Sequence, residues 1–144
     1  NSITSKEKIK KDARYAIFME GIEKAKEFSL LGEGFYKYQN SNIKSSHVTH
    51  YHNNFIETAV TQGSLTLIAY IIFLINLFIS MVKNYLKEND RLKKYIKLLA
   101  ISTFVFINFY GLFEVTFYFE KIYQLVFTII AISFIIDNNG TKKI

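Results

Sequence analysis

The sequence predicts an all-α fold: a polytopic membrane protein fragment with three transmembrane helices and an extracytoplasmic helical loop. Two observations predict it. Residues 65–82 carry no charged side chain, and two further apolar stretches follow them. The first 62 residues are polar, with nine Lys and Arg against seven Asp and Glu. The chain therefore divides into an outer loop domain, 1–62, a membrane part, 63–137, and a tail, 138–144.

The apolar stretches place the three spans at about 64–83, 95–113 and 117–136. Each is about as long as the roughly 20 residues that a helix needs to cross a hydrocarbon core about 30 Å thick. Lys97 is a charge near the start of the second span. Such helices satisfy their own backbone hydrogen bonds, which lipid cannot do.

Basic residues set the predicted orientation. The cytoplasmic loop, 84–94, with its flanks at Lys83 and Lys97 carries six basic against two acidic residues, and Lys142 and Lys143 follow the third span. An excess of Lys and Arg marks cytoplasmic segments. Residues 1–62 and the turn at 114–121 are therefore expected outside, facing the periplasm or the cell exterior.

Composition excludes several classes of protein. The net charge of +6 comes mostly from one short loop and shows no groove-reading pattern, so no nucleic-acid partner is expected. Without cysteine there are no disulfides and no thiolate metal sites. The chain opens with Asn1 inside an outward-facing loop, which we interpret as the C-terminal piece of a longer protein.

The outer domain contains two predicted helices. Apolar residues recur at spacings of three and four over residues 5–28, the pattern of an amphipathic helix. Gly32 and Gly34 then predict a tight turn, and 36–51 an irregular loop. Asn54 with Glu57 three residues later predicts a capping box. The short helix that follows is expected to bury Phe55, Ile56, Ala59 and Val60.

His52 stands just before that short helix, next to the first predicted span. The positive end of a helix disfavours imidazolium, so a neutral nitrogen there can accept a proton. The same amide-rich end favours a nearby phosphate. Taken alone, a single histidine at this position is more often an interfacial side chain without chemistry.

The wider pattern is more specific. His52-Asn53, nine residues, Gly63, two residues and Thr66 resembles the signature of the O-antigen ligase family, which also includes O-antigen and capsule polymerases. Family members carry it at the end of a large outer loop, directly before a membrane helix. They also place an Arg-bearing helix and a Gly-x-Gly turn before it, as Arg14 and 32–34 do here, although the usual Pro before the turn is absent.

The resemblance implies a membrane glycosyltransferase at the outer face of the bacterial cytoplasmic (inner) membrane. Its donor would be an undecaprenyl-diphosphate-linked glycan, and its acceptor a lipid A core or another carrier-linked glycan. His52 would deprotonate the acceptor hydroxyl, and Arg14 would bind the diphosphate leaving group through its fork of donors. No cofactor and no metal are expected, and this piece alone is expected to be inactive. Supporting roles fall to Asn53, Glu57, Gly63, Thr66, Gly32 and Gly34.

Several alternatives stay open. Arg14 is also compatible with a solvated helix face, and Glu57 with capping or with orienting His52. Tyr36, Tyr38 and Tyr51 fit sugar stacking or interfacial anchoring equally. A non-catalytic membrane protein could use its outer loop to bind a partner, or a metal through His47, His50 and His52. Gly111 and Glu114 resemble the Gly and Glu of the family's outer hairpin, and Glu114 is placed facing water or a cavity. The residues favour polymerase slightly over ligase but do not identify the sugar, the linkage or the oligomeric state.

Overall fold

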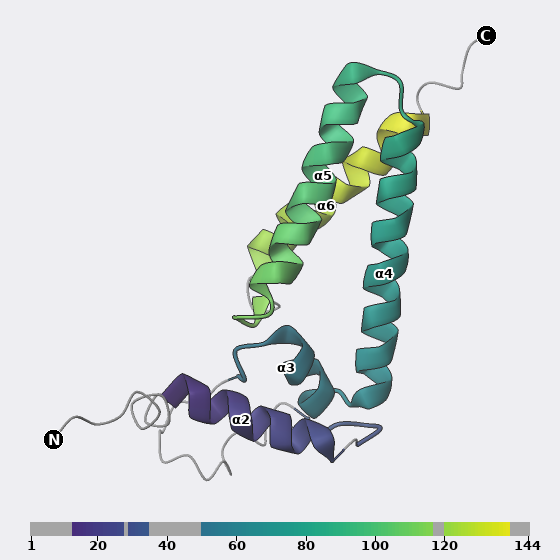
Figure 1. Ribbon diagram of the computed structural model, residues 1–144. Coiled ribbons are helices and arrows are strands. Elements are labelled where there is room, and N and C mark those ends of the chain that lie inside the picture. The colour runs from purple at the N-terminus through teal and green to yellow at the C-terminus, as the bar shows by residue number, and fades with distance from the viewer. Residues whose placement is uncertain (1–12, 28, 35–49, 117–119, 139–144) are drawn as a thin grey trace, which may run out of the picture. The chain divides into compact units, whose positions relative to one another are not determined.

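The computed structural model describes residues 13–27, 29–34, 50–116 and 120–138. These residues form two compact units. The first contains the described residues up to Tyr70 together with Gly111–Val115, and the second contains Ile71–Tyr110 and the described residues from Thr116 on. The helices in these ranges are α2 (Ala13–Lys26), α3 (Asn54–Thr61), α4 (Ser64–Lys87), α5 (Arg91–Tyr110) and α6 (Glu120–Asn138), as Figure 1 shows.

The all-α prediction is confirmed, with boundaries that differ in places. The predicted 5–28 helix is described from Ala13 as α2, and residues 1–12 lie outside the described part. The second predicted span begins four residues early, at Arg91, because the Asp90 carboxylate accepts a hydrogen bond from the Lys93 amide at 2.9 Å and caps the helix. It ends before Gly111 rather than at Phe113.

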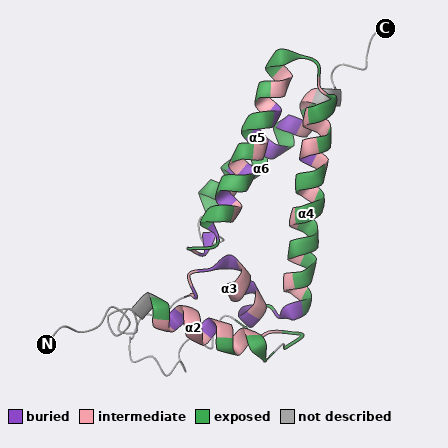
Figure 2. Cartoon of the chain, in the orientation of Figure 1, coloured by how far each residue is buried: buried purple, intermediate pink, exposed green. Residues whose placement is uncertain are grey.

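The prediction of three membrane spans needs correction. Among the described residues, only α4 is long and apolar enough to cross a membrane. Its apolar window is only 6% buried, and its large apolar side chains are mostly exposed (Figure 2). Charged residues shorten the apolar parts of α5 and α6. Residues 98–110 and 122–136 are each uncharged over about 20 Å at 1.5 Å per residue.

The second unit has an apolar core. Met81 from α4 packs with Ala100, Phe104 and Ile107 from α5 and with Val126 and Ile130 from α6, all of them buried. Phe78 stacks on Phe104, with 6.1 Å between the ring centroids. These contacts pack the three helices together through one stripe of each, while most of their remaining apolar side chains face outward.

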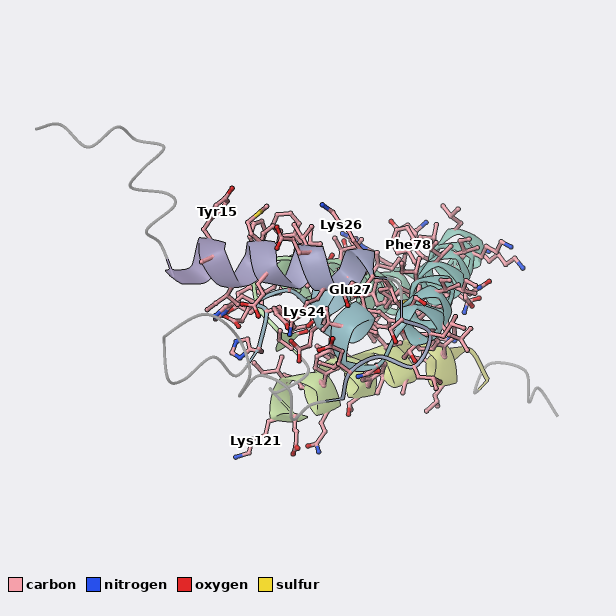
Figure 3. All side chains as sticks on the ribbon, turned by 90° about the horizontal axis from the view of Figure 1, so that it is seen from below. Tyr15, Lys24, Lys26, Glu27, Phe78 and Lys121 are labelled. Atoms are coloured by element: carbon pink, nitrogen blue, oxygen red, sulfur yellow. The ribbon has the colours of Figure 1, made fainter. Side chains whose placement is uncertain are left out.

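The first unit packs α2 against α3. Its buried apolar cluster consists of Ile17 of α2, Val60 of α3, and Tyr51, which precedes α3. Gly21 makes the close approach possible, because a Cβ atom at this position would lie 2.6 Å from Ile56 Cγ2 and 2.7 Å from Tyr51 Cδ1. Lys24 projects from the side of α2 opposite to Tyr15 and Lys26 (Figure 3).

A buried ion pair fixes the turn between α4 and α5. The Lys97 side chain is only 4% exposed, and its Nζ donates to Glu88 Oε2 at 2.8 Å and to the Asn84 carbonyl at 3.2 Å. The hydrogen bond from Lys97, together with one from the Asp90 amide, lowers the pKa of the Glu88 carboxyl to about 2. A lysine buried in a predicted span thus has a partner that the sequence did not identify.

This pair makes stability depend on pH. Since the pKa of Glu88 is lower in the folded protein, its contribution is complete above about pH 4.5 and is lost as the pH falls towards 2. Glu88→Gln should therefore lower the thermal unfolding midpoint near neutral pH, and its difference from the wild type should shrink as the pH falls through that window. The matched control, Glu120→Gln, removes an exposed carboxylate and should leave the midpoint unchanged. A difference that stays constant down to acid pH would contradict the assignment.

Candidate functional site

The candidate site is built around the start of α3. The Asn53 side chain is the N-cap: its Oδ1 accepts hydrogen bonds from the Phe55 and Ile56 amides at 2.9 and 3.0 Å. These bonds satisfy two of the four amide donors that a helix leaves free at its start. The predicted cap at Asn54 is therefore wrong by one residue. Asn54 is already the first residue of the helix.

Glu57 acts one residue further into the helix than a capping box requires. Its Oε2 accepts a hydrogen bond from the Tyr51 amide at 3.0 Å, and its side chain is buried. It thereby holds the backbone of the residue before His52. The buried face of α3 is mostly polar (Asn54, Glu57, Thr58 and Thr61 beside Val60). The predicted apolar face is confirmed for Val60, whereas Phe55, Ile56 and Ala59 are only partly buried.

Two hydrogen bonds tie this helix start to a turn nearly sixty residues later. The Asn54 amide donates to the Gly111 carbonyl at 2.8 Å. Asn53 Nδ2 donates to the Leu112 carbonyl at 2.9 Å. Asn53 therefore uses both ends of its amide group, one to cap α3 and the other to hold residues 111–115.

The turn brings Glu114 against two histidines. His50 Nε2 lies 2.6 Å from Glu114 Oε1, and His52 Nδ1 lies 3.0 Å from Oε1 and 3.2 Å from Oε2. The two imidazole rings are 4.3 Å apart between centroids. All three side chains are about one-fifth exposed. We call them the His-His-Glu cluster.

His52 adopts an unusual backbone conformation, with φ at +53°. Non-glycine residues with positive φ are uncommon, and strained conformations of this kind concentrate at functional sites. Here the flanking residues Tyr51 and Asn53 are both buried and hydrogen-bonded, so the chain turns sharply between them. That turn directs the His52 ring towards Glu114.

Hydrogen bonds keep Glu114 ionised. Burial alone would raise the pKa of this carboxyl, but the bonds from His50, the Val115 amide and His52 together hold its pKa below the usual value. An ionised Glu114 is an acceptor only, so each imidazole must direct an N–H towards it. In the neutral form of the His52 ring the proton is then on Nδ1, and Nε2 has a lone pair that can accept a proton.

The two glycine motifs meet in the first unit. Gly32 and Gly63 both have positive φ, and a Cβ atom on either would collide with backbone of the other segment. The Glu33 amide donates to the Val60 carbonyl at 2.7 Å, and the Gly34 amide to the Thr61 carbonyl at 2.9 Å. The Gly-x-Gly turn therefore packs against the end of α3. Lys24 of α2 reaches the same turn, with its Nζ 3.5 Å from Glu33 Oε2.

The other predicted residues are less directly placed. Arg14 is the second residue of α2, and its side chain is outside the described part, as are His47, Tyr36 and Tyr38. Tyr51 is buried in the α2–α3 cluster, so it neither stacks on a sugar nor anchors at an interface. Thr66 Oγ1 donates to the Gln62 carbonyl at 3.0 Å within the first turn of α4.

Sequence reasoning missed two members of the cluster as site residues. Glu114 was named only as part of a short Gly-Glu pattern, and His50 only as a member of the three-histidine alternative. The sequence offered one indication: all three residues of the cluster are polar groups predicted on the outer side of the membrane. Glu114 is the acidic residue of the outer turn that comes nearest to Gly111 in sequence. The contact itself depends on tertiary pairing that no local pattern contains.

Comparison of the chain with protein-family models, with curated proteins and with solved structures found no match in any of the three.

The double role of Asn53 gives a test. Asn53→Ala removes both the cap and the bond to Leu112, and loss of a cap costs about 1 kcal/mol. Asn53→Asp still accepts from the Phe55 and Ile56 amides but cannot donate to Leu112. Amide hydrogen exchange should show lost protection at Phe55 and Ile56 in the Ala variant only. Equal protection in the two variants would contradict the capping role.

Proposed function

We propose that the chain is part of a membrane glycosyltransferase of the O-antigen ligase and polymerase type. The enzyme transfers or polymerises undecaprenyl-diphosphate-linked glycan units at the outer face of the bacterial cytoplasmic membrane. The acceptor is a sugar hydroxyl of a carrier-linked glycan or of lipid A core. The reaction forms a glycosidic bond to that oxygen, breaks the bond from the anomeric carbon to the diphosphate, and moves the hydroxyl proton to the enzyme.

The observation that carries this proposal is the hydrogen bond between His52 Nδ1 and Glu114. A carboxylate on one imidazole nitrogen fixes the tautomer in which the other nitrogen is a base. It also stabilises the imidazolium formed when that base takes a proton. General-base catalysis of this kind contributes about 10²- to 10⁴-fold in rate. Glu114 is thus a positioning residue, and His52 is the proposed catalytic base.

Packing supports a second role for α2. A buried cluster of Ile17, Tyr51 and Val60 packs α2, which bears Arg14, against α3, which follows His52. A guanidinium never deprotonates in this pH range and forms bidentate bonds to phosphate oxygens. We assign Arg14 to the diphosphate leaving group. Four further residues support the structure around the site through the contacts described above: Asn53, Glu57, Gly32 and Gly63.

The pairing of residues 50–54 with 111–115 also supports a multi-pass topology. Because these segments share one compact unit, the chain between them must cross a membrane either twice or not at all. The apolar α4 fits a crossing, and in this proposal α5 returns across the membrane, although among the described helices only α4 is long and apolar enough to be a span by itself. Exposed apolar residues on α5 and α6, including Phe106 and Leu125, fit lipid contact. In this topology the charged N-terminal end of α5 lies at the inner surface of the membrane, where the long side chains of lysine can place their charged groups in water.

Cysteine labelling tests this topology in a chain that has no cysteine of its own. A cysteine introduced at Ser46 should react with an impermeant thiol reagent in intact cells, and one at Asn89 should react only after the membrane is permeabilised. The opposite result would reverse the orientation. Reaction at both positions in intact cells would rule out a crossing by α4.

Substitutions of His52 and of Arg14 should affect different steps of the reaction in the full-length protein. His52→Ala should leave binding of the carrier-linked donor largely intact and lower glycan transfer by roughly 10²-fold or more, as expected for a lost general base. Arg14→Lys keeps the charge but loses the planar fork, so it should weaken donor binding and transfer together. The measurements are transfer with purified carrier-linked glycan and a separate donor-binding assay.

The controls separate chemistry from folding. His47→Ala removes the histidine to which the proposal gives no role and should transfer normally. Thermal unfolding of every variant identifies those that fail to fold. Near-normal transfer by a folded His52→Ala protein would refute the catalytic assignment.

A further inference from the structure

The His-His-Glu cluster has a second chemistry besides proton transfer. Two imidazole nitrogens and one carboxylate oxygen, each able to bind a metal, lie within 4.8 Å of one another. Three protein ligands and an open position are the usual composition of zinc sites that also bind water. The sequence-based alternative used His47, which lies outside the described residues; among those described, Glu114 joins His50 and His52 and is the anionic ligand that the three-histidine set lacked.

We propose that the His-His-Glu cluster binds a divalent transition metal of the zinc class in place of the hydrogen bonds that now join its side chains. Imidazole with carboxylate suits Zn²⁺ and Co²⁺, whereas Mg²⁺ and Ca²⁺ prefer oxygen ligands alone. One carboxylate and two neutral rings leave the bound ion with a single net positive charge. Water on the open side completes the tetrahedron.

The distances fit a site that closes on an ion after a small adjustment. Zinc lies about 2.0–2.2 Å from nitrogen and oxygen ligands, so ligand atoms in a tetrahedral site stand about 3.3 Å apart. The present separations of 2.6, 3.0 and 3.2 Å from the imidazole nitrogens to Glu114 are hydrogen-bonding distances. The ring nitrogens must approach each other while the carboxylate moves back slightly. Side chains that are about one-fifth exposed have room to do this.

Metal binding exchanges bonds without net loss of a proton. His50 Nε2 and His52 Nδ1 each give up a hydrogen bond to Glu114 and form a bond to the ion. Each ring then carries its proton on the other nitrogen, transferred through solvent. For His52 that nitrogen is Nε2, the atom proposed as the base. A bound ion therefore inhibits transfer, and this consequence rests on the proposed function, whereas the binding does not.

Binding is measured on the full-length protein without any transfer assay. Co²⁺ serves as the spectroscopic probe, because its visible absorption reports tetrahedral coordination, and Zn²⁺ titration calorimetry gives the affinity. The wild type should bind one ion. Loss of a partner behind a metal ligand typically weakens binding 10- to 100-fold, so loss of a ligand in His50→Gln, His52→Gln or Glu114→Gln should weaken it by at least about tenfold.

Two matched variants are the controls. His47→Gln removes the remaining histidine, and Glu120→Gln removes a carboxylate exposed at the start of α6. Both should bind like the wild type. Absence of saturable 1:1 binding by folded wild-type protein would overturn the proposal, as would wild-type affinity in the Glu114→Gln variant. A large loss in His47→Gln would show that the three-histidine set is the real site.

The transfer assay then separates the two proposals. Zn²⁺ should inhibit transfer reversibly, EDTA should restore it, and EDTA alone should leave the rate unchanged. Binding without inhibition would keep the metal site and refute His52 as the base. Activation by Zn²⁺ would contradict the proposal that a bound ion moves the His52 proton to Nε2.

Discussion

The site depends on one tertiary contact, the pairing of the α3 start with the turn at 111–115. Two hydrogen bonds make it, from the Asn54 amide to Gly111 and from Asn53 Nδ2 to Leu112. Without these bonds, Glu114 would lie in a short exposed turn, and nothing would hold its carboxylate near a histidine. With them, its carboxylate lies within hydrogen-bonding distance of two imidazoles, whose bonds compensate for its partial burial. The same contact holds the two segments in one compact unit, so the geometry of the site follows from one constraint.

A polar buried helix explains why this contact is specific. α3 buries Asn54, Glu57, Thr58 and Thr61. Glu57 accepts a hydrogen bond from the Tyr51 amide, and both threonines donate to carbonyls of α3. A buried polar group left without a partner costs about 1–3 kcal/mol, so a shifted arrangement of the flanking segments would be penalised more than one that buried apolar side chains. The glycine contact between Gly32 and Gly63 adds a steric limit, since neither position accepts a Cβ atom.

Local patterns in the sequence predicted the helices well because helix periodicity and capping are local. They predicted the bounds of α3 and α4 almost correctly. For α2, the predicted helix covers all of the described residues Ala13–Lys26. They placed the cap at Asn54 rather than Asn53, since both residues have side chains suited to capping and only tertiary bonds to Leu112 distinguish them. Span prediction failed for α5 because an uncharged stretch was counted without weighing the basic residues that begin the helix. For the site, His52 and the two glycine motifs were identified from sequence, but the partner Glu114 required a contact across 62 residues.

The cluster brings two imidazoles to one carboxylate, and the second imidazole is its most informative property. Glu114 Oε1 alone accepts from both imidazoles, at 2.6 and 3.0 Å, and lies 3.2 Å from the Val115 amide. One histidine would be sufficient to form a base and its orienting acid. The second imidazole, His50, adds a nitrogen lone pair whenever its proton moves to the other ring nitrogen. In the proposed metal site that lone pair would bind the ion, which gives His50 a role that a base and its carboxylate alone do not require.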